Sequence, residues 1–378
     1  MSSGSAGVAT RVAFGSLAQD YREKRAAIDA AIAGVLERGR FILGEEVARF
    51  EDGFSKFLGV AHVVGCANGT EAIALALQAA GARAEDEVVL PANTCVPTLV
   101  GVRLSGARPR LADVDPETLT LDAENAVRVR TPATRFLLPV HLYGGVADLE
   151  GLGALARSEG LSLVEDCAQS HGAGLGGRPT GSFGRAAAFS FYPSKNLGAY
   201  GDAGAVATND TEIAARLRQL RQYGWDRRDH AEREGWNSRL DELQAAILTA
   251  KLPWLSRENA RRRAIAERYD SAFREMPLRL LAVRPGTLPA RHLYPVFSDR
   301  RDALREHLGS RGIETGLHYP LPLHLQPAYA FLGYRKGDFP VSEDACETEL
   351  SLPLYPTLAD SQVDAVISAV GEFFGRRA

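Results

Sequence analysis

The feature that most constrains the fold is the alternation of short apolar segments with helical ones between residues 62 and 166. Strands joined by helices of ~10–15 residues need crossover connections, which place them parallel in a sheet covered on both faces. Two later apolar segments, 186–191 and 204–209, are expected to join this sheet as antiparallel or mixed strands. We therefore predict an α/β chain with a mostly parallel central sheet. The expected strands are 62–67, 87–92, 108–114, 135–144, 161–166, 186–191 and 204–209.

The last third of the chain has a different organisation. A long helix is predicted from Leu240 toward Phe273, with a kink at Pro253. Beyond it, one strand and two helices indicate a smaller α+β unit, so we expect a large domain at 1–254 and a C-terminal domain at 255–378. Further helices are expected at 17–39, 44–59, 149–160, 210–222, 300–311 and 360–375, with a strand at 291–297 and a proline-rich and aromatic lid at 318–343.

Composition excludes several classes of protein. The 378 residues are 45% hydrophobic and 24% charged, and a net charge of −3 provides no general attraction to nucleic acid or anionic membranes. The four cysteines have no CxxC spacing, which predicts no metal site and a reducing compartment. The first ten residues resemble a disordered start rather than a signal peptide. No apolar run reaches the ~20 residues of a membrane span. We expect a cytoplasmic protein without nucleic-acid or membrane partners.

The segment 163–204 places an acid and a lysine in an unusual setting. A strand ends in Asp166, and Lys195 follows a second strand among glycine and aromatic residues. Pyridoxal phosphate (PLP) enzymes need this pair, because the lysine forms a Schiff base with the aldehyde and the acid keeps the ring nitrogen protonated. Taken singly, the lysine could be a surface charge and the acid could cap a loop.

A second feature is the run Asn68-Gly69-Thr70 between a strand and a helix. Free N–H groups at a helix N-terminus favour an anion such as phosphate, although such residues also serve simply as N-caps. The glycine run 172–177 opens no helix and lacks a Lys-Ser/Thr partner, so we interpret it as a hairpin. In parallel sheets, ligands bind beyond the carboxyl ends of strands. The sequence Asn68-Gly69-Thr70, His141, Asp166 and Gln169 are all expected at such ends.

Four motifs together give the chain its resemblance to a known family: CANGTEA (66–72), EDCAQSHGA (165–173), SFYPSKNLGAYGDAGAV (190–206) and WNSRLDELQAAIL (236–248). Over nearly its whole length the chain resembles the DegT/DnrJ/EryC1/StrS family of PLP-dependent sugar aminotransferases. The resemblance implies the aspartate aminotransferase-like fold, that is, the type I fold of PLP-dependent transferases.

The resemblance also implies catalytic roles. Lys195 matches the Schiff-base lysine, whose released amine moves the proton between the substrate and the cofactor. Asp166 matches the acid that pairs with the pyridinium nitrogen, and Gln169 matches the residue that contacts the ring hydroxyl. His171 and Arg239 lie inside the motifs with no assigned role; a structural hydrogen bond is the simpler reading for each.

The phosphate of PLP is expected in a cradle formed by Gly69, Thr70 and Ser190. Asn237 matches an asparagine that reaches this phosphate from the neighbouring subunit, which implies a homodimer with shared active sites. From the residues alone, Ser190 could instead be a buried strand serine bonded to backbone. Asn237 could likewise be a plain turn residue before the long helix.

One position departs from the family pattern. Many relatives carry an aromatic residue where Cys95 stands, and a cysteine offers no π-face to the PLP ring. Cys95 is therefore either a cofactor contact or a buried residue with no role in the site. Tyr192, His318 and Tyr319 are candidates for contact with the sugar or its diphosphate; packing roles remain open for all three.

The expected reaction is amino transfer from glutamate, during which the cofactor alternates between PLP and pyridoxamine phosphate (PMP). The motifs are most similar to those of members that act on C3 of a dTDP-linked 3-keto-6-deoxyhexose in deoxyamino sugar biosynthesis. A C4 or uronic-acid keto sugar, a cyclitol, and a non-catalytic PLP-binding regulatory role are the alternatives.

Overall fold

The centre of the protein is a seven-stranded sheet in the order β1-β9-β8-β5-β4-β2-β3. The computed structural model describes residues 11–375, so the expected disordered start lies outside it. Only β9 among these strands runs antiparallel to the others, which confirms a mostly parallel sheet with a mixed edge. The strands are β1 (His62–Cys66), β2 (Glu87–Pro91), β3 (Arg108–Ala112), β4 (Thr134–Leu137), β5 (Ser162–Asp166), β8 (Ala186–Ser190) and β9 (Gly204–Thr208).

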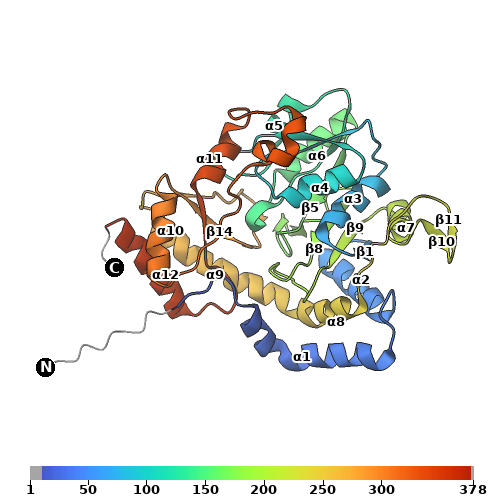
Figure 1. The fold of residues 1–378 in the computed structure, drawn as a ribbon, viewed down its shortest axis with the longest axis horizontal. Coiled ribbons are helices and arrows are strands. Elements are labelled where there is room, and N and C mark those ends of the chain that lie inside the picture. Colours follow the sequence, from blue (N-terminus) through green and yellow to red (C-terminus); the bar gives the residue numbers. More distant parts are fainter. Residues whose placement is uncertain (1–10, 376–378) are drawn as a thin grey trace.

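Helices cover both faces of the sheet (Figure 1). Side chains alternate between the faces along a strand. Thus Val88 and Leu90 of β2 pack in one core and Val89 packs in another. The first face carries α3 (Gly69–Ala79), α4 (Val96–Leu104) and α7 (Thr211–Leu220). The second carries α2 (Glu45–Leu58), α5 (Ala123–Val129), α6 (Leu149–Glu159) and α8 (Glu242–Lys251).

The fourth strand is much shorter than predicted. A strand over 135–144 was expected, but β4 ends at Leu137. Pro139 has no N–H to donate to the sheet, and the chain continues through one isolated bridge to a 3-10 turn, η1 (Leu142–Gly144). The short helix α5 was also not predicted.

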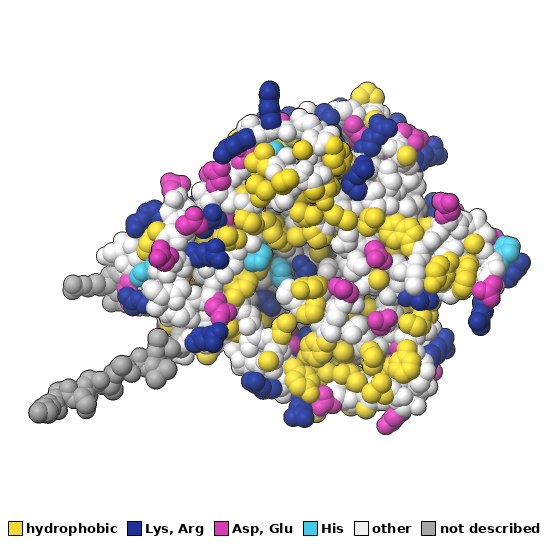
Figure 2. Space-filling model, viewed as in Figure 1, with side chains coloured by type: hydrophobic (Ala, Val, Ile, Leu, Met, Phe, Trp, Pro, Cys, Tyr) yellow, Lys and Arg dark blue, Asp and Glu magenta, His cyan; other side chains and the backbone are white. Residues whose placement is uncertain are grey.

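A long helical axis joins the two parts of the chain, as predicted. Helix α8 passes through a 3-10 turn, η2 (Leu252–Trp254), at Pro253 and continues as α9 (Leu255–Phe273). Helix α1 (Leu17–Arg38) packs against α8 and leaves Leu17 and Leu36 about half exposed. Figure 2 shows hydrophobic side chains gathered over this part of the surface, where Figure 1 places α1.

The C-terminal part has its own core. A three-stranded sheet in the order β12-β14-β15 packs against helices, and Val12 from the N-terminal segment joins this core. The division of the chain at residue 254 stays a prediction. The elements are β12 (Arg279–Leu280), β14 (Tyr294–Phe297), β15 (Glu349–Leu352), α10 (Arg301–Ser310), α11 (Pro340–Thr348) and α12 (Asp360–Phe373). None of the helices within 11–375 has the length and hydropathy of a membrane span.

The segment 318–343 is packed into the fold rather than free to form a lid. Leu323 is fully buried in the core on the α3 and α4 face. Two 3-10 helices, η3 (Leu323–Leu325) and η4 (Pro327–Leu332), follow it. Burial of an apolar side chain contributed from a distant segment cannot be read from local sequence. The glycine run 172–177 was predicted as a hairpin, and the structure has one here, formed by β6 (Gly174–Leu175) and β7 (Arg178–Pro179), to which β13 (Thr287–Leu288) is added.

The junction between α2 and α8 depends on one buried carboxylate. Glu242 accepts hydrogen bonds from the backbone N–H groups of Gly44, Glu46 and Val47 at 2.7–3.0 Å. It thus satisfies donors that the first turn of a helix cannot pair internally, and its charge complements the helix dipole.

We expect Glu242→Ala to lower the free energy of unfolding by about 3 kcal/mol, because buried donors would be left unpaired at about 1–3 kcal/mol each. Urea unfolding followed by fluorescence measures this loss. Glu45→Ala, an exposed residue in the same turn, is the matched control. Equal stabilities of the two variants would contradict this account.

Candidate active site

The predicted site residues meet in one cavity of about 620 Å³ at the carboxyl ends of β1, β5 and β8. This is the edge of the sheet where ligands of α/β proteins bind. Ten of the predicted residues line the cavity: Gly69, Thr70, Cys95, Asp166, Gln169, Ser190, Tyr192, Lys195, His318 and Tyr319. Asn237 is exposed and does not line it.

Asp166 supplies a buried carboxylate at the end of β5. Its Oδ2 accepts a hydrogen bond from the hydroxyl of Thr98 at 2.9 Å, and its Oδ1 accepts one from the N–H of Ala168 at 3.0 Å. Burial raises the pKa of this carboxyl, against the lowering effects of those hydrogen bonds and of Lys195. Among residues 11–375, no lysine, arginine or histidine side chain forms an ion pair with Asp166. A carboxylate in this state is suited to receive the N–H of a protonated ring nitrogen.

The N-terminus of α3 forms a polar pocket beside this acid. The side chain of Asn68 caps the helix by accepting from the N–H of Glu71 at 2.9 Å. Within residues 11–375 the N–H groups of Gly69 and Thr70 have no acceptor, so they are available to an anion. A Cβ on Gly69 would lie 2.5 Å from Cβ of Ser190, so only glycine lets the helix approach β8 so closely.

Lys195 stands on a loop whose backbone is firmly held. Its N–H donates to the carbonyl of Tyr192 at 2.8 Å. The next residue, Asn196, donates to the side chain of Asn259 at 2.8 Å and pairs with a ring nitrogen of His292 at 2.9 Å. Burial lowers the pKa of Lys195, while Asp166 opposes that shift. Its amine therefore loses a proton more readily than an exposed lysine, as a nucleophile requires.

Gln169 fixes an aromatic wall of the cavity. Its Oε1 accepts from the N–H of Tyr143 at 2.6 Å, and its Nε2 donates to the hydroxyl of Tyr319 at 3.1 Å. The same hydroxyl interacts with the thiol of Cys95, whose pKa burial raises. Cys95 thus lies at the cavity wall beside a tyrosine.

His318 joins the cavity to the N-terminal segment. Its ring stacks on Phe14 with centroids 5.6 Å apart, and its Nδ1 pairs with the hydroxyl of Ser351 at 3.0 Å. Burial lowers the pKa of His318 to about 4, so the ring is neutral near pH 7. Tyr192, in contrast, is 55% exposed at the rim.

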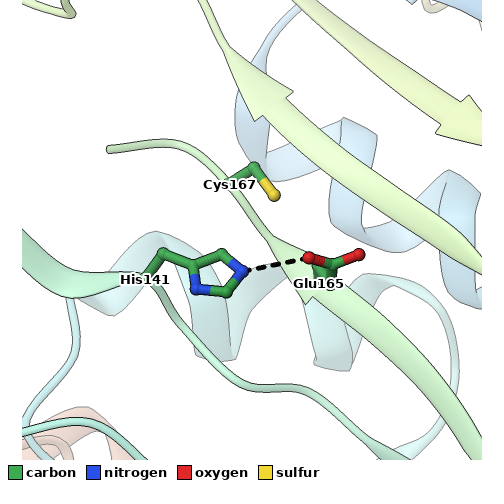
Figure 3. A group of neighbouring side chains, drawn as sticks. All are labelled: His141, Glu165 and Cys167. Atoms are coloured by element: carbon green, nitrogen blue, oxygen red, sulfur yellow. Dashed lines mark hydrogen bonds and ion pairs between the residues drawn. The ribbon is translucent and has the colours of Figure 1, made fainter. Parts of the chain in front are cut away.

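Behind the site lies a buried group formed by His141, Glu165 and Cys167 (Figure 3). The N–H of Ala147 donates to Nδ1 of His141 at 3.1 Å, so its Nε2 carries the proton and donates to Glu165 at 3.1 Å. The carboxylate of Glu165 also accepts three backbone N–H groups of the hairpin segment, those of Gly181, Phe183 and Gly184.

Although these three side chains lie close enough to hold a metal ion, both ring nitrogens and both carboxylate oxygens are already bonded within the protein. We interpret the group as a clamp that ties the hairpin to β5. His141 was expected at this sheet edge, but its role here is structural.

Three residues of the site were not predicted. Thr98 orients Asp166, whereas Asn196 and His292 anchor the lysine loop. Thr98 lies one helical turn after Thr94, and the two hydroxyls are 3.1 Å apart. Two threonines at this four-residue spacing, next to the mostly apolar helix α4, were a usable signal. His292 has no such signal, because its partner is 96 residues away.

Comparison with known proteins agrees with this geometry. Residues 22–371 match the DegT/DnrJ/EryC1/StrS aminotransferase family. The chain is 46% identical, over 97% of both chains, to the dTDP-3-amino-3,4,6-trideoxy-alpha-D-glucose transaminase of Streptomyces venezuelae.

Two solved structures have the same fold. The crystal structure of S. venezuelae DesV with a ketimine intermediate has a TM-score of 0.95 and 45% identity, covering 97% of this chain and 100% of that one. NtdA of Bacillus subtilis with bound PMP has a TM-score of 0.87 and 30% identity, covering 94% and 82%.

The fold and site thus define an aminotransferase of the PLP-dependent type. The chain belongs to the DegT/DnrJ/EryC1/StrS aminotransferase family. The predicted fold class and family are confirmed, and the individual residue roles stay predictions.

Gly69→Ala is expected to raise the dissociation constant for PLP at least tenfold, about 1.4 kcal/mol, because the new Cβ would push α3 from β8. Titration of the apoprotein with PLP measures it. Gly53→Ala is the control, because its nearest neighbour would be a Leu252 methyl at 3.5 Å. Affinity within twofold of wild type in Gly69→Ala would refute the cradle.

Proposed function

We propose that the protein transfers the amino group of glutamate to C3 of a dTDP-linked 3-keto-6-deoxyhexose, with PLP and PMP as the two forms of its cofactor. The observation that carries the proposal is the meeting of Lys195, Asp166 and the N-terminus of α3 in one cavity. The high similarity to a transaminase named for a dTDP-3-amino sugar supports the choice of substrate.

The residues present fit PLP at three points. Lys195 would hold its aldehyde, Asp166 its ring nitrogen, and the N–H groups of Gly69 and Thr70, with the hydroxyl of Ser190, its phosphate. When bound, PLP supplies an electron sink for the carbon that loses or gains a proton. Asp166 keeps that sink effective, because its carboxylate stabilises the protonated ring nitrogen.

Lys195 then acts as the acid and base of the reaction. After release its amine lies in the cavity, within a loop fixed by Asn196. Because burial lowers its pKa, a larger fraction of the amine is unprotonated near neutral pH and can accept a proton. The negative charge of Asp166 opposes this lowering of the Lys195 pKa, because it stabilises the ammonium that forms when the amine accepts a proton.

The keto sugar is proposed to contact His318, Tyr319 and Tyr192. A neutral His318 can exchange hydrogen bonds with sugar hydroxyls without attracting a counter-ion. Tyr319 is held by Gln169, which gives its ring a fixed position in the wall. Tyr192 at the rim is exposed enough to stack on a nucleotide base.

We further propose a homodimer in which Asn237 completes the partner's cofactor site. Asn237 is exposed outside the cavity of its own subunit. Next to it lies an apolar patch, made of Phe41, Ile42 and Tyr223, whose side chains are 39–46% exposed. Ile42 pairs with Asp241 through an isolated bridge, which brings the patch beside the Asn237 turn. Exposed apolar clusters of this kind mark protein interfaces.

The cytoplasm is the proposed compartment. All four cysteines are free, and three of them are buried. Thiols kept reduced at these positions fit a reducing environment.

The test of the function is an absorbance titration of the PLP-loaded protein. We expect glutamate to bleach the visible band and dTDP-3-keto-6-deoxyglucose to restore it, and Lys195→Ala to show neither change because the amine is absent. Bleaching without recovery would contradict the C3 substrate and direct trials to C4-keto sugars and cyclitols. No response to glutamate would contradict the proposed donor and favour a regulatory role.

The shared site predicts complementation between inactive subunits. Lys195→Ala and Asn237→Ala proteins, mixed and refolded together, should regain about a quarter of wild-type activity at limiting PLP, since random pairing makes half of the dimers hybrids with one intact site. Each parent assayed alone is the control. Activity no higher than the sum of the parents would rule out the sharing of Asn237.

A further inference from the structure

A second cavity of about 310 Å³ opens on the lysine loop, and no function has been assigned to it above. It shares Ser194, Lys195, His292 and His318 with the cofactor cavity. Its remaining walls come from residues 14–17, helices α1, α8 and α9, the lysine loop, and residues 293 and 354–357. Its volume falls within the roughly 300–1,000 Å³ of small-molecule sites. The space therefore leads from Lys195 into the contact between the N-terminal segment and the C-terminal part.

A buried arginine faces this cavity. Arg262 of α9 is only 8% exposed. Its Nη1 donates to the carbonyl of Leu354 at 2.8 Å and, more weakly, to that of His292 at 3.4 Å. Within residues 11–375 its Nε and Nη2 donate to no acceptor, and no carboxylate forms an ion pair with it. These two groups form the edge of the guanidinium that grips a carboxylate in bidentate fashion.

Apart from Lys195, the other charged side chains around the cavity are already paired. Asp20 forms ion pairs with Lys24 and, at 3.1 Å, with Lys251. Glu258 is paired with Lys24. The two carboxylates are thus engaged by the two lysines, and the guanidinium of Arg262, like the amine of Lys195, is left without an ion pair. A buried cation without a counter-ion is costly. Burial lowers the pKa of Arg262 to about 10, although the charges of Glu258 and Asp20 oppose that shift, and this value is still well above neutrality.

Arg262 is linked to the lysine loop by a short chain of contacts. It donates to the carbonyl of His292, and the ring of His292 pairs with Asn196, the residue after Lys195. A ligand held by the free edge of Arg262 would therefore lie in the cavity onto which the amine of Lys195 opens.

We propose that Arg262 binds a carboxylate of the amino-acid donor, so that the second cavity is the donor site. The inference rests on the proposed function, which requires an amino acid to present its amine where Lys195 acts. One free bidentate edge matches one carboxylate. The diphosphate of a nucleotide sugar fits less well, because it would bring two negative charges beside Asp20 and Glu258.

The first test is rapid mixing of PLP-loaded protein with glutamate. For Arg262→Gln we expect the glutamate concentration that gives half the maximal bleaching rate to rise at least 30-fold, with the maximal rate changed less than threefold. The concentration of keto sugar required by the PMP form should stay within threefold of wild type. Arg263→Gln, the neighbouring half-buried residue of α9 outside the cavity, should match wild type in both half-reactions.

An unchanged glutamate requirement in Arg262→Gln would overturn the proposal. So would a raised requirement for the sugar alone, which would assign Arg262 to the diphosphate. If wild type itself ignores glutamate, the proposed function fails, and the cavity is then judged by the second measurement.

The second measurement is calorimetric binding of glutarate, a dicarboxylate without an amine, to the apoprotein. Wild type should bind it, Arg262→Gln at least tenfold more weakly, and Arg262→Lys between the two. Circular dichroism checks that the variants fold. If Arg262→Gln does not fold, the glutarate affinity of Arg262→Lys is compared with that of wild type instead. Equal glutarate affinity in wild type and the folded variants, or no binding to wild type, would refute the site.

Discussion

The buried carboxylate of Asp166 is the interaction on which the arrangement of the site depends. It lies at the carboxyl end of a central strand, where its backbone pairs with the segment after β4. A hydroxyl from α4 and an N–H from the following loop hold its oxygens. Because a buried charge must be satisfied, the strand, the helix and the loop are constrained together. The polarity of the cavity follows from this constraint.

Glu165 and Asp166 show how one strand end serves two purposes. Successive side chains of a strand point to opposite sides. Glu165 therefore turns away from the cavity and clamps the hairpin with His141, while Asp166 faces the cavity. Two acids adjacent in sequence thus separate into a structural and a chemical role. The lysine loop is fixed in the same way, through Asn196 and a hydrogen bond from Lys251 to the carbonyl of Gly198.

Much of the fold was readable because its signals are local. The alternation of apolar strands with helices predicted the sheet, and Pro253 marked the kink between α8 and α9. One error had a local cause, because strand β4 stops before Pro139, which lies inside the predicted strand. The others arose where distant segments decide the outcome: the short strand β15 exists only through its pairing with β14, and Leu323 is buried in a core far from its neighbours in sequence.

The class of fold and the chemistry at its centre can be read from the sequence, because periodicity and the residue types around Lys195 and Asp166 are properties of the chain. Which polar groups are paired and which are left free depends on the packing of the folded protein. Thr98 acquires its role from a partner 68 residues away, and Arg262 faces a cavity built by both ends of the chain. The physical reason is that desolvation and hydrogen bonding depend on which side chains burial brings within about 3 Å of one another, and sequence spacing does not fix that distance.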